Sequence, residues 1–147
     1  MRTRRRLSLI VAVVAALTAA PALSAQSADE QSIRATIAEY FRGHATADSA
    51  VMRRPFLPTA HIEGVRQGTF TSWTLDQYVG GFRGVPAADE ARRSRRVDDV
   101  RVIGTAAMAQ ATLDHVGAVF TDFFVLLKVN GEWKIANKVY HAAPRTP

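Results

Sequence analysis

The chain has 147 residues, of which 48% are hydrophobic and 22% are charged, and it carries a formal net charge of +6. This length suits a single globular domain with its own core. Because the sequence contains no cysteine, it excludes a lipid-modified lipoprotein and any disulfide framework, so the stability of the fold must come from packing.

Residues 1–25 have the three-part pattern of a secretory signal peptide. Four arginines within the first six residues precede an apolar run, Leu7–Leu17, which is followed by small residues and a proline. The run is short for a membrane span, which needs about 20 residues, so an uncleaved anchor is the less favoured alternative. We expect cleavage after Ala25, with Ala22 and Ser24 as alternatives, and a secreted or periplasmic domain formed by residues 26–147.

Removing this leader changes the charge balance of the chain. The leader holds four of the 19 basic residues and none of the 13 acidic ones, which leaves 15 against 13, a net charge of +2. The basic pI is therefore no indication of nucleic-acid binding, and we expect neither a nucleic-acid partner nor a membrane partner after cleavage. The run Arg92–Arg96 predicts a solvated loop or the start of a strand, with polyanion binding as the alternative.

Helical signals dominate the first part of the mature chain. Ser27 and Glu30 form an S-x-x-E capping box that predicts a helix start, and Gly43 predicts its end. A second short helix is expected from Asp48 to Arg54, before a proline. The stripe at helical spacing inside the first helix consists of Ile33, Ile37, Tyr40 and Phe41.

A hairpin and a third helix are expected next. Residues 60–73 alternate like two strands around a turn at Gln67-Gly68, and Thr74 begins a second capping box, T-x-x-Q. Residues 84–93 show no periodicity and predict a loop.

From Val97 onward the pattern predicts four strands joined by short turns. They cover residues 97–103, 106–116, 119–129 and 132–142. Between the last two, Asn130-Gly131 predicts a two-residue type I′ turn. Such a turn fixes the register, with Val129 opposite Glu132, Leu126 opposite Ile135, Phe124 opposite Asn137 and Phe120 opposite His141.

This register, with alternation of side chains, predicts two faces. The opposite face would hold apolar residues such as Phe123, Val125 and Leu127, together with Lys138 and Tyr140. The face of interest would carry Phe120, Asp122, Phe124, Leu126, Ile135, Asn137, Val139 and His141.

The preceding turn, with Gly117-Ala118 as its tip, would add small and polar residues to the same face. These are Ala109, Ala111, Leu113 and His115. Alanines leave space, and Asp122, His115, Asn137 and His141 would converge on it, which is typical of a ligand pocket. An unpaired carboxylate in dry core is costly, so we expect Asp122 to face a cavity or a buried network.

The candidate site residues follow from this face and from the helices. Each has a structural role as its alternative: a hydrogen-bonded carboxylate or imidazole, or an aromatic core residue. Asp122 and His115 are the candidates for acid–base catalysis, because an Asp122–His115 or Asp122–His141 pair could serve it and histidine titrates near neutral pH. The predicted ligand-binding residues are Asp122, His115, Asn137, His141, Phe124, Tyr40, Trp73 and Tyr78, with aromatic rings able to stack on a flat ligand.

Other chemistries are not indicated. The four histidines lack metal-ligand spacing, there is no G-x-S-x-G elbow, and no glycine-rich phosphate loop is present. We therefore expect no metal and no cofactor. His61 beside Glu63 ranks below His115, and His44 is expected to be a capping or surface group.

Three segments carry a resemblance to a known family: "YFRGHATAD", "FLPTAHIEG" and "TDFFVLLKVNGEWKIANKVYH". With the order of helices before a sheet, residues 29–144 resemble the putative lumazine-binding family of the nuclear transport factor 2-like superfamily, which includes polyketide cyclases and ketosteroid isomerase. The chain departs from the family pattern at Leu57-Pro58-Thr59-Ala60, where members often carry His-Pro-Asp-Ala. The aspartate, tyrosine and protonated acid of ketosteroid isomerase have no full match here.

The resemblance implies a fold, and together with the two predicted faces of the sheet it leaves three candidate functions. The fold is α+β, with about three N-terminal helices packed on a strongly curved, mostly antiparallel sheet that encloses a pocket, and dimers are frequent. The first function is binding of a small, largely apolar or heterocyclic molecule. The alternatives are an isomerase, cyclase or dehydratase that uses the same pocket, and a homodimeric accessory or assembly module that uses the second apolar face.

Overall fold

In this computed structural model the backbone is described for residues 19–145 and the side chains for residues 26–145. The predicted leader falls largely outside these residues, and its cleavage and the resulting export stay predictions. Within the described part of the chain, no helix combines the length and hydrophobicity that crossing a membrane requires.

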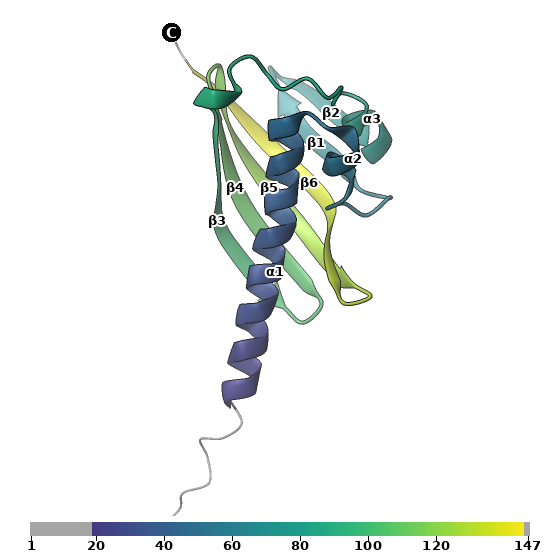
Figure 1. The fold of residues 1–147 in the computed structure, drawn as a ribbon, viewed down its shortest axis with the longest axis vertical. Coiled ribbons are helices and arrows are strands. Elements are labelled where there is room, and N and C mark those ends of the chain that lie inside the picture. The colour runs from purple at the N-terminus through teal and green to yellow at the C-terminus, as the bar shows by residue number, and fades with distance from the viewer. Residues whose placement is uncertain (1–18, 146–147) are drawn as a thin grey trace, which may run out of the picture.

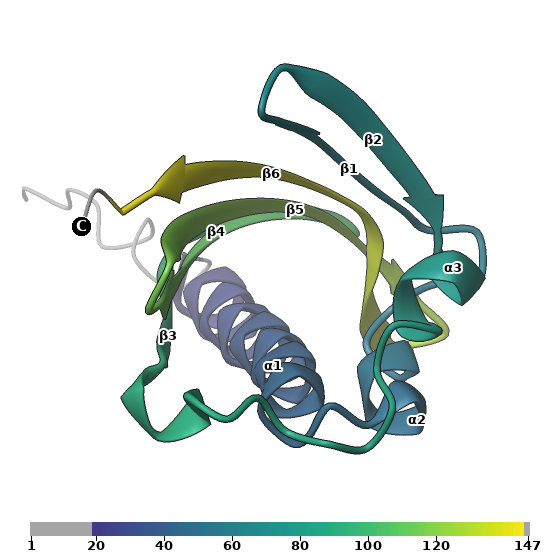
Figure 2. The ribbon, with the colours of Figure 1, turned by 90° about the horizontal axis from the view of Figure 1, so that it is seen from above.

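The fold is a curved six-stranded sheet with helices on one side, in the order β2-β1-β6-β5-β4-β3. Only β1 and β6 are parallel; the other neighbours are antiparallel. Figures 1 and 2 show helix α1 lying inside the curve of the sheet. The strands are β1 (His61–Arg66), β2 (Thr69–Thr74), β3 (Ser94–Ile103), β4 (Ala106–His115), β5 (Ala118–Val129) and β6 (Glu132–Pro144). The predicted α+β class is confirmed.

Helix α1 (Ala19–Thr46) is longer than predicted at both ends. The expected start at Ser27 is wrong, because the residues before it are mostly good helix formers and Pro21 lies in the first turn, where proline is tolerated. The expected end at Gly43 is also wrong. A Cβ at Gly43 would lie 2.7 Å from the Cα of Met52, so this glycine permits close packing of the next helix rather than ending its own.

The two short helices form where the sequence predicts them. In α2 (Ser49–Arg53) the side chain of Asp48 accepts hydrogen bonds from two backbone N–H groups of the first turn, at 2.8 and 3.1 Å. In α3 (Leu75–Val79) Thr74 forms the predicted capping box. The segment predicted as a loop contains one short 3₁₀ helix, Glu90–Arg92.

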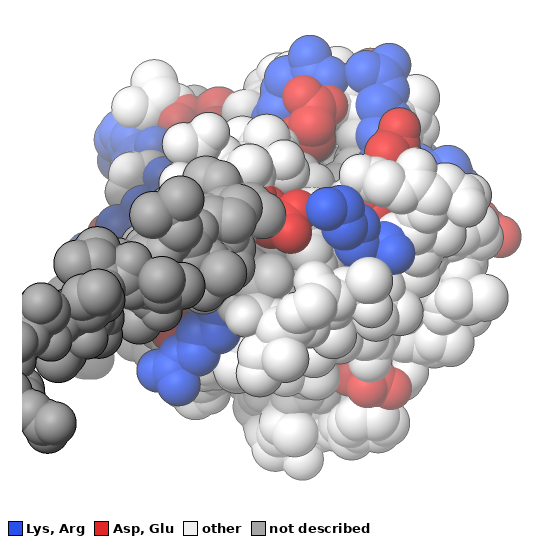
Figure 3. All heavy atoms as spheres, turned by 90° about the horizontal axis from the view of Figure 1, so that it is seen from below, with Lys and Arg blue, Asp and Glu red and all other residues white. Residues whose placement is uncertain are grey.

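The run Arg92–Arg96 leads into a strand, because β3 begins at Ser94. The start of a strand is one of the two structures predicted for this run, the other being a solvated loop. Its charges are compensated locally by the ion pairs Arg93–Asp89, Arg95–Glu90 and Arg96–Asp98. These ion pairs do not favour a polyanion-binding surface at the run. At the opposite end of the molecule (Figure 1), which Figure 3 shows, basic and acidic side chains are interspersed.

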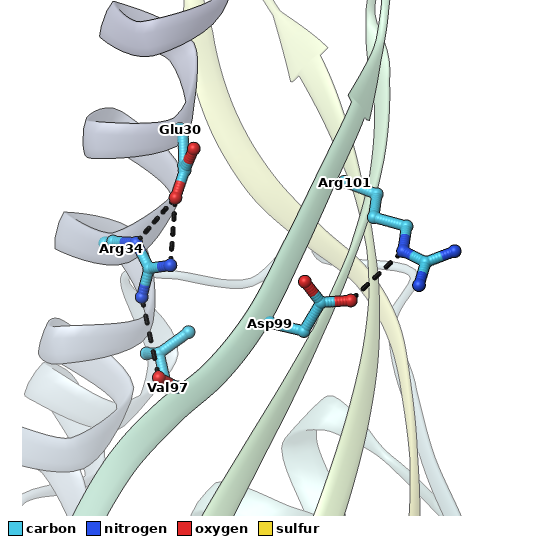
Figure 4. A network of polar contacts seen from close by, with 5 residues as sticks. All are labelled: Glu30, Arg34, Val97, Asp99 and Arg101. Carbon is cyan, nitrogen blue, oxygen red and sulfur yellow. Dashed lines mark hydrogen bonds and ion pairs between the residues drawn. The ribbon is translucent and has the colours of Figure 1, made fainter.

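Polar contacts also attach α1 to the outer strand β3 (Figure 4). Arg34 pairs with Glu30 one helical turn away, at 2.9 Å, and its other nitrogen lies 3.5 Å from the carbonyl oxygen of Val97. On β3 itself Arg101 pairs with Asp99. The contact between Arg34 and Val97 ties the helix to the edge of the sheet farthest from the β1–β2 hairpin.

The turn at Asn130-Gly131 is confirmed, with φ values of 52° and 85° as a type I′ turn requires. The predicted register holds from Val129–Glu132 to Leu126–Ile135 and is wrong beyond it. There Ala136 is an extra residue, a β-bulge, so that Val125 pairs with Asn137 instead.

This one-residue offset exchanges the two faces of β6. Lys138 and Tyr140 now lie beside Phe124 and Asp122 on the inner face, whereas Asn137 and His141 lie on the outer face. The predicted convergence of Asn137 and His141 on Asp122 is therefore wrong, because the alternation of side chains reverses at a bulge.

The β4–β5 turn also differs from the prediction, but here the faces of the strands are not exchanged. Its tip is Val116-Gly117, so Leu113 pairs with Phe120 and Ala111 with Asp122. The pairing differs by two residues from the predicted one, and an even shift leaves each side chain on its face. Ala109, Ala111, Leu113 and His115 share the Asp122 face, as predicted.

Candidate ligand-binding site

Three buried polar groups meet where α1 crosses the middle of the sheet. Asp122 on β5 and Lys138 on β6 form an ion pair, with Oδ2 and Nζ 3.0 Å apart and side-chain exposures of 1% and 5%. Tyr40 on α1 donates to the same Oδ2 at 2.6 Å and accepts from Lys138 at 2.8 Å. Asp122 is thus held in a buried network, one of the two environments predicted for it.

Aromatic rings surround the ammonium of Lys138. Its Nζ lies 5.1, 5.6 and 5.2 Å from the ring centroids of Tyr40, Tyr78 and Tyr140, distances at which cation–π attraction operates. Burial alone would lower the pKa of Lys138, but the neighbouring Tyr78 and Asp122 outweigh it and the pKa lies above its usual value. Lys138 is therefore a cation at neutral pH.

A second set of contacts extends the network to the end of α1. The hydroxyl of Tyr78 lies 3.1 Å from Nε2 of His44 and 3.5 Å from the hydroxyl of Tyr40. Burial first, and then the charges of Lys138 and Arg95, hold the pKa of His44 well below its usual value. A neutral His44 can accept a hydrogen bond from the hydroxyl of Tyr78, which orders the network.

A cavity of about 160 Å³ adjoins these groups. Its walls combine aromatic rings with a few polar side chains, the usual composition of a ligand site. The lining residues are Tyr40, His44, Ile62, Arg66, Trp73, Tyr78, Leu113, His115, Phe120, Asp122, Lys138 and Tyr140.

Two buried polar atoms of lining residues have no hydrogen-bond partner among the described residues. They are Oδ1 of Asp122 and Nε2 of His115. Lys138 has three N–H donors, of which two point to Asp122 and Tyr40. Buried polar groups are nearly always satisfied, so Oδ1 of Asp122 and Nε2 of His115 are candidates for hydrogen bonds to a ligand.

The pKa of His115 is also lowered, first by burial and then by the positive charges of Arg93 and Arg95. Its ring is neutral at pH 7. Within the part of the chain that is described, no hydrogen bond joins Asp122 to His115 or His141, and Asp122 is bound by Lys138 and Tyr40 instead. The Asp–His pair that motivated a catalytic role for Asp122 and His115 is not formed.

Five of the predicted ligand-binding residues line the cavity: Asp122, His115, Tyr40, Trp73 and Tyr78. Three do not. Phe124 is buried in the core against Tyr40, Asn137 accepts a hydrogen bond from the backbone of His61 at 2.8 Å, and His141 is exposed.

Sequence reasoning missed Lys138, Tyr140, His44, Arg66 and Phe120 as site residues. Lys138 and Tyr140 were missed because the bulge moves them from the predicted outer face to the inner face. His44 follows Tyr40 by four residues, a spacing that puts both on one helix face, but the helix was expected to end at Gly43. Among the described residues no cluster of three acidic or histidine side chains could hold a metal ion.

The cavity wall at Tyr140 depends on a glycine in the neighbouring strand. Gly64 on β1 pairs with Tyr140, and a Cβ on Gly64 would lie 2.6 Å from the tyrosine ring. Tyr140 can therefore lie flat across β1, stack on Trp73 at an interplanar angle of 6° and contact the hydroxyl of Thr71 at 3.1 Å. This contact fixes two aromatic walls of the cavity.

Comparison with solved structures shows the fold. The chain is similar to an NTF2-like protein of unknown function from Shewanella baltica OS155, with 31% identity, a TM-score of 0.73, and coverage of 81% of this chain and 97% of the other. It is also similar to an NTF-2 like protein of unknown function from Silicibacter pomeroyi DSS-3, with 25% identity, a TM-score of 0.71 and coverage of 79% and 97%.

A more distant similarity is to a ketosteroid isomerase-like protein from Erwinia carotovora atroseptica, with 14% identity, a TM-score of 0.61 and coverage of 80% and 96%. It concerns the fold alone. The comparison with curated proteins gave no match. A protein-family model described as "Putative lumazine-binding" matches residues 28–141, which include most of α1, most of the sheet and every residue that lines the cavity. The chain therefore belongs to this family, within the NTF2-like fold.

Proposed function

We propose that this protein binds a small, flat heterocycle with an amide or imide edge in the cavity beside Asp122 and Lys138. An imide offers an N–H donor next to a carbonyl acceptor. The free Oδ1 of Asp122 can accept the first, and the third N–H of Lys138 can donate to the second. The unpartnered buried oxygen of Asp122 is the observation that carries this proposal.

The size of the cavity is sufficient for one ring of such a heterocycle. A cavity of about 150 Å³ in another protein holds one benzene ring, and this one measures about 160 Å³. Trp73, Tyr78 and Tyr140 supply flat walls on which a ring can stack. Lumazine, from which the family takes its description, has such an imide edge on two fused rings.

We also propose that the domain acts outside the cytoplasm. The support for this is the basic and apolar pattern of residues 1–25. Amino-terminal sequencing of the protein from its host's periplasm or medium tests it, with a start near residue 26 as the expected result. An intact N-terminus on cytoplasmic protein would contradict export.

Binding is tested by titrating the purified protein with lumazine, followed by calorimetry and by tryptophan fluorescence. We expect saturable binding and a changed signal from Trp73, which lines the cavity. Trp73→Ala and His115→Leu remove a stacking wall and an unpartnered nitrogen, and both should weaken binding. His61→Leu, at an exposed histidine outside the cavity, is the matched control and should bind like the wild type.

Two results would refute this function. One is the absence of saturation with lumazine and also with uracil, a smaller ring with the same imide edge. The other is equal weakening by His115→Leu and the His61→Leu control, which would put the binding elsewhere on the protein.

A homodimer is the second proposal, and the outer face of the sheet supports it. Phe123, Val125 and Leu127 on β5 are 41%, 52% and 41% exposed, and Met108 and Val139 beside them are also exposed. A contiguous apolar surface of this kind is typical of an interface. Solution scattering at micromolar concentration tests it: twice the monomer mass is expected, and a monomer would dismiss it.

A further inference from the structure

A second hollow adjoins the first at the open end of the sheet. It measures about 460 Å³ and lies between the tip of the β1–β2 hairpin, the β4–β5 turn and the last residues of β6. Figure 2 shows the hairpin diverging from β6 toward its tip, and the pairing of β1 with β6 ends at Val65–His141. We call this hollow the hairpin groove.

The cavity and the hairpin groove share two lining residues, Arg66 and Phe120. Arg66 occupies the last position of β1, on the face that carries Ile62 and Gly64, and its side chain is exposed. The cavity thus opens beside Arg66, and anything too long for it would leave along the hairpin groove.

The positive charge of Arg66, where the cavity opens, is not compensated by a nearby acid in the part of the chain that the structure describes. Arg66 makes no hydrogen bond or ion pair with the described residues, unlike the arginines at the start of β3. No acidic residue lines the hairpin groove, whose other titratable group is His141. The acid nearest in the cavity, Asp122, is already paired with Lys138, and Glu63 on the other face of β1 accepts from Ser72.

On this basis, and resting on the proposed function, we propose that the ligand carries an anionic tail, a carboxylate or phosphate, that passes Arg66 into the hairpin groove. The ring occupies the cavity and the tail ends beside the guanidinium. Arginine suits this role because its planar fork of N–H donors matches the oxygens of both anions.

Three probes test the proposal: lumazine, lumazine with a four-carbon chain ending in a carboxylate, and the same chain ending in a carboxamide. A fourth, ending in a phosphate, distinguishes the two anions. Each is titrated into the wild type, Arg66→Gln and Arg83→Gln. Arg83 is an exposed arginine outside both hollows, so Arg83→Gln loses the same charge.

We expect the carboxylate probe to bind about two- to fivefold more tightly than the carboxamide probe, the range of an exposed ion pair. Higher salt should reduce this ratio. Arg66→Gln should abolish this ratio and Arg83→Gln should keep it. Because Arg66 also lines the ring cavity, bare lumazine can lose some affinity for Arg66→Gln, but the carboxylate probe should lose more.

Failure of the tail site and failure of the ring site give different results. If lumazine binds but the carboxylate and carboxamide probes bind equally, the anionic tail is refuted and the ring site stands. If Arg83→Gln removes the preference as fully as Arg66→Gln, the effect is net charge and the tail site is again refuted. If no probe binds, the ring site itself is refuted and the tail site with it.

Discussion

Replacing Lys138 by methionine should be among the most damaging single changes in this protein. Methionine has a similar length and keeps the packing, but it leaves the Asp122 carboxylate, 1% exposed, without its cation. Breaking a buried ion pair from one side costs about 3–5 kcal/mol, whereas removing both charges can be nearly neutral. At roughly 3–5 °C per kcal/mol for a domain of this size, Tm should fall by about 10–20 °C.

The assay is urea and thermal unfolding of the wild type, Lys138→Met, Asp122→Leu and the double variant. The double variant should be more stable than Lys138→Met alone, because no charge is left buried without a partner. Lys134→Met, at a partly exposed lysine that pairs with Glu132 near the turn, is the control and should cost less than about 1 kcal/mol. A cost for Lys138→Met as small as this control, or additive costs in the double variant, would refute the reasoning.

Three further changes test other features. The pKa of His44 lies below its usual value in the folded protein, so below about pH 6.5 the unfolded chain binds a proton at this histidine before the folded chain does. The free energy of unfolding should therefore decrease as the pH is lowered, by up to about 1.4 kcal/mol per pH unit for this histidine. Urea unfolding between about pH 8 and 5 should show a weaker dependence on pH for His44→Phe than for the wild type, and an unchanged dependence would contradict the reasoning. Gly64→Ala drives a methyl group into Tyr140 and should cost about 1–3 kcal/mol, whereas Gly117→Ala, with open space around it, is its control; equal melting temperatures would disprove the contact. Gly43→Ala should destabilise the protein in thermal unfolding although alanine favours helices by about 1 kcal/mol, since its Cβ would meet the backbone of Met52; a stabilised variant would show that the two helices can separate.

Local signals predicted the parts of the fold that local interactions determine. Asn130-Gly131 specified its turn because few residue pairs adopt two positive φ angles, and Thr74 specified a helix start because its hydroxyl satisfies a backbone N–H of the first turn. The ends of α1 were wrong for the opposite reason. What happens at Gly43 is decided by Met52 on another helix, and no pattern within α1 reports that contact.

The site was predicted in part for the same reason. Asp122 stood out because a carboxylate interrupts an apolar strand, and β4 supplied its inner residues since an error of two in the turn does not reverse alternation. Lys138 was placed on the wrong face by the bulge at Ala136. The turn fixes the register only at its own end of the hairpin. The bulge lies next to Ile135, whose backbone N–H donates to the carbonyl of Pro55 and whose carbonyl accepts from Leu57, contacts with a distant segment that the strand's own pattern does not report.

The bulge at Ala136 means that chain length, and not only residue identity, determines the chemistry of this wall. With the extra residue, a lysine and a tyrosine point inward; without it, the same letters would present an amide and an imidazole. Relatives that differ here by a single insertion or deletion could therefore share nearly all their residues and still select different molecules. Position-by-position matching of such sequences would compare side chains that never occupy equivalent places.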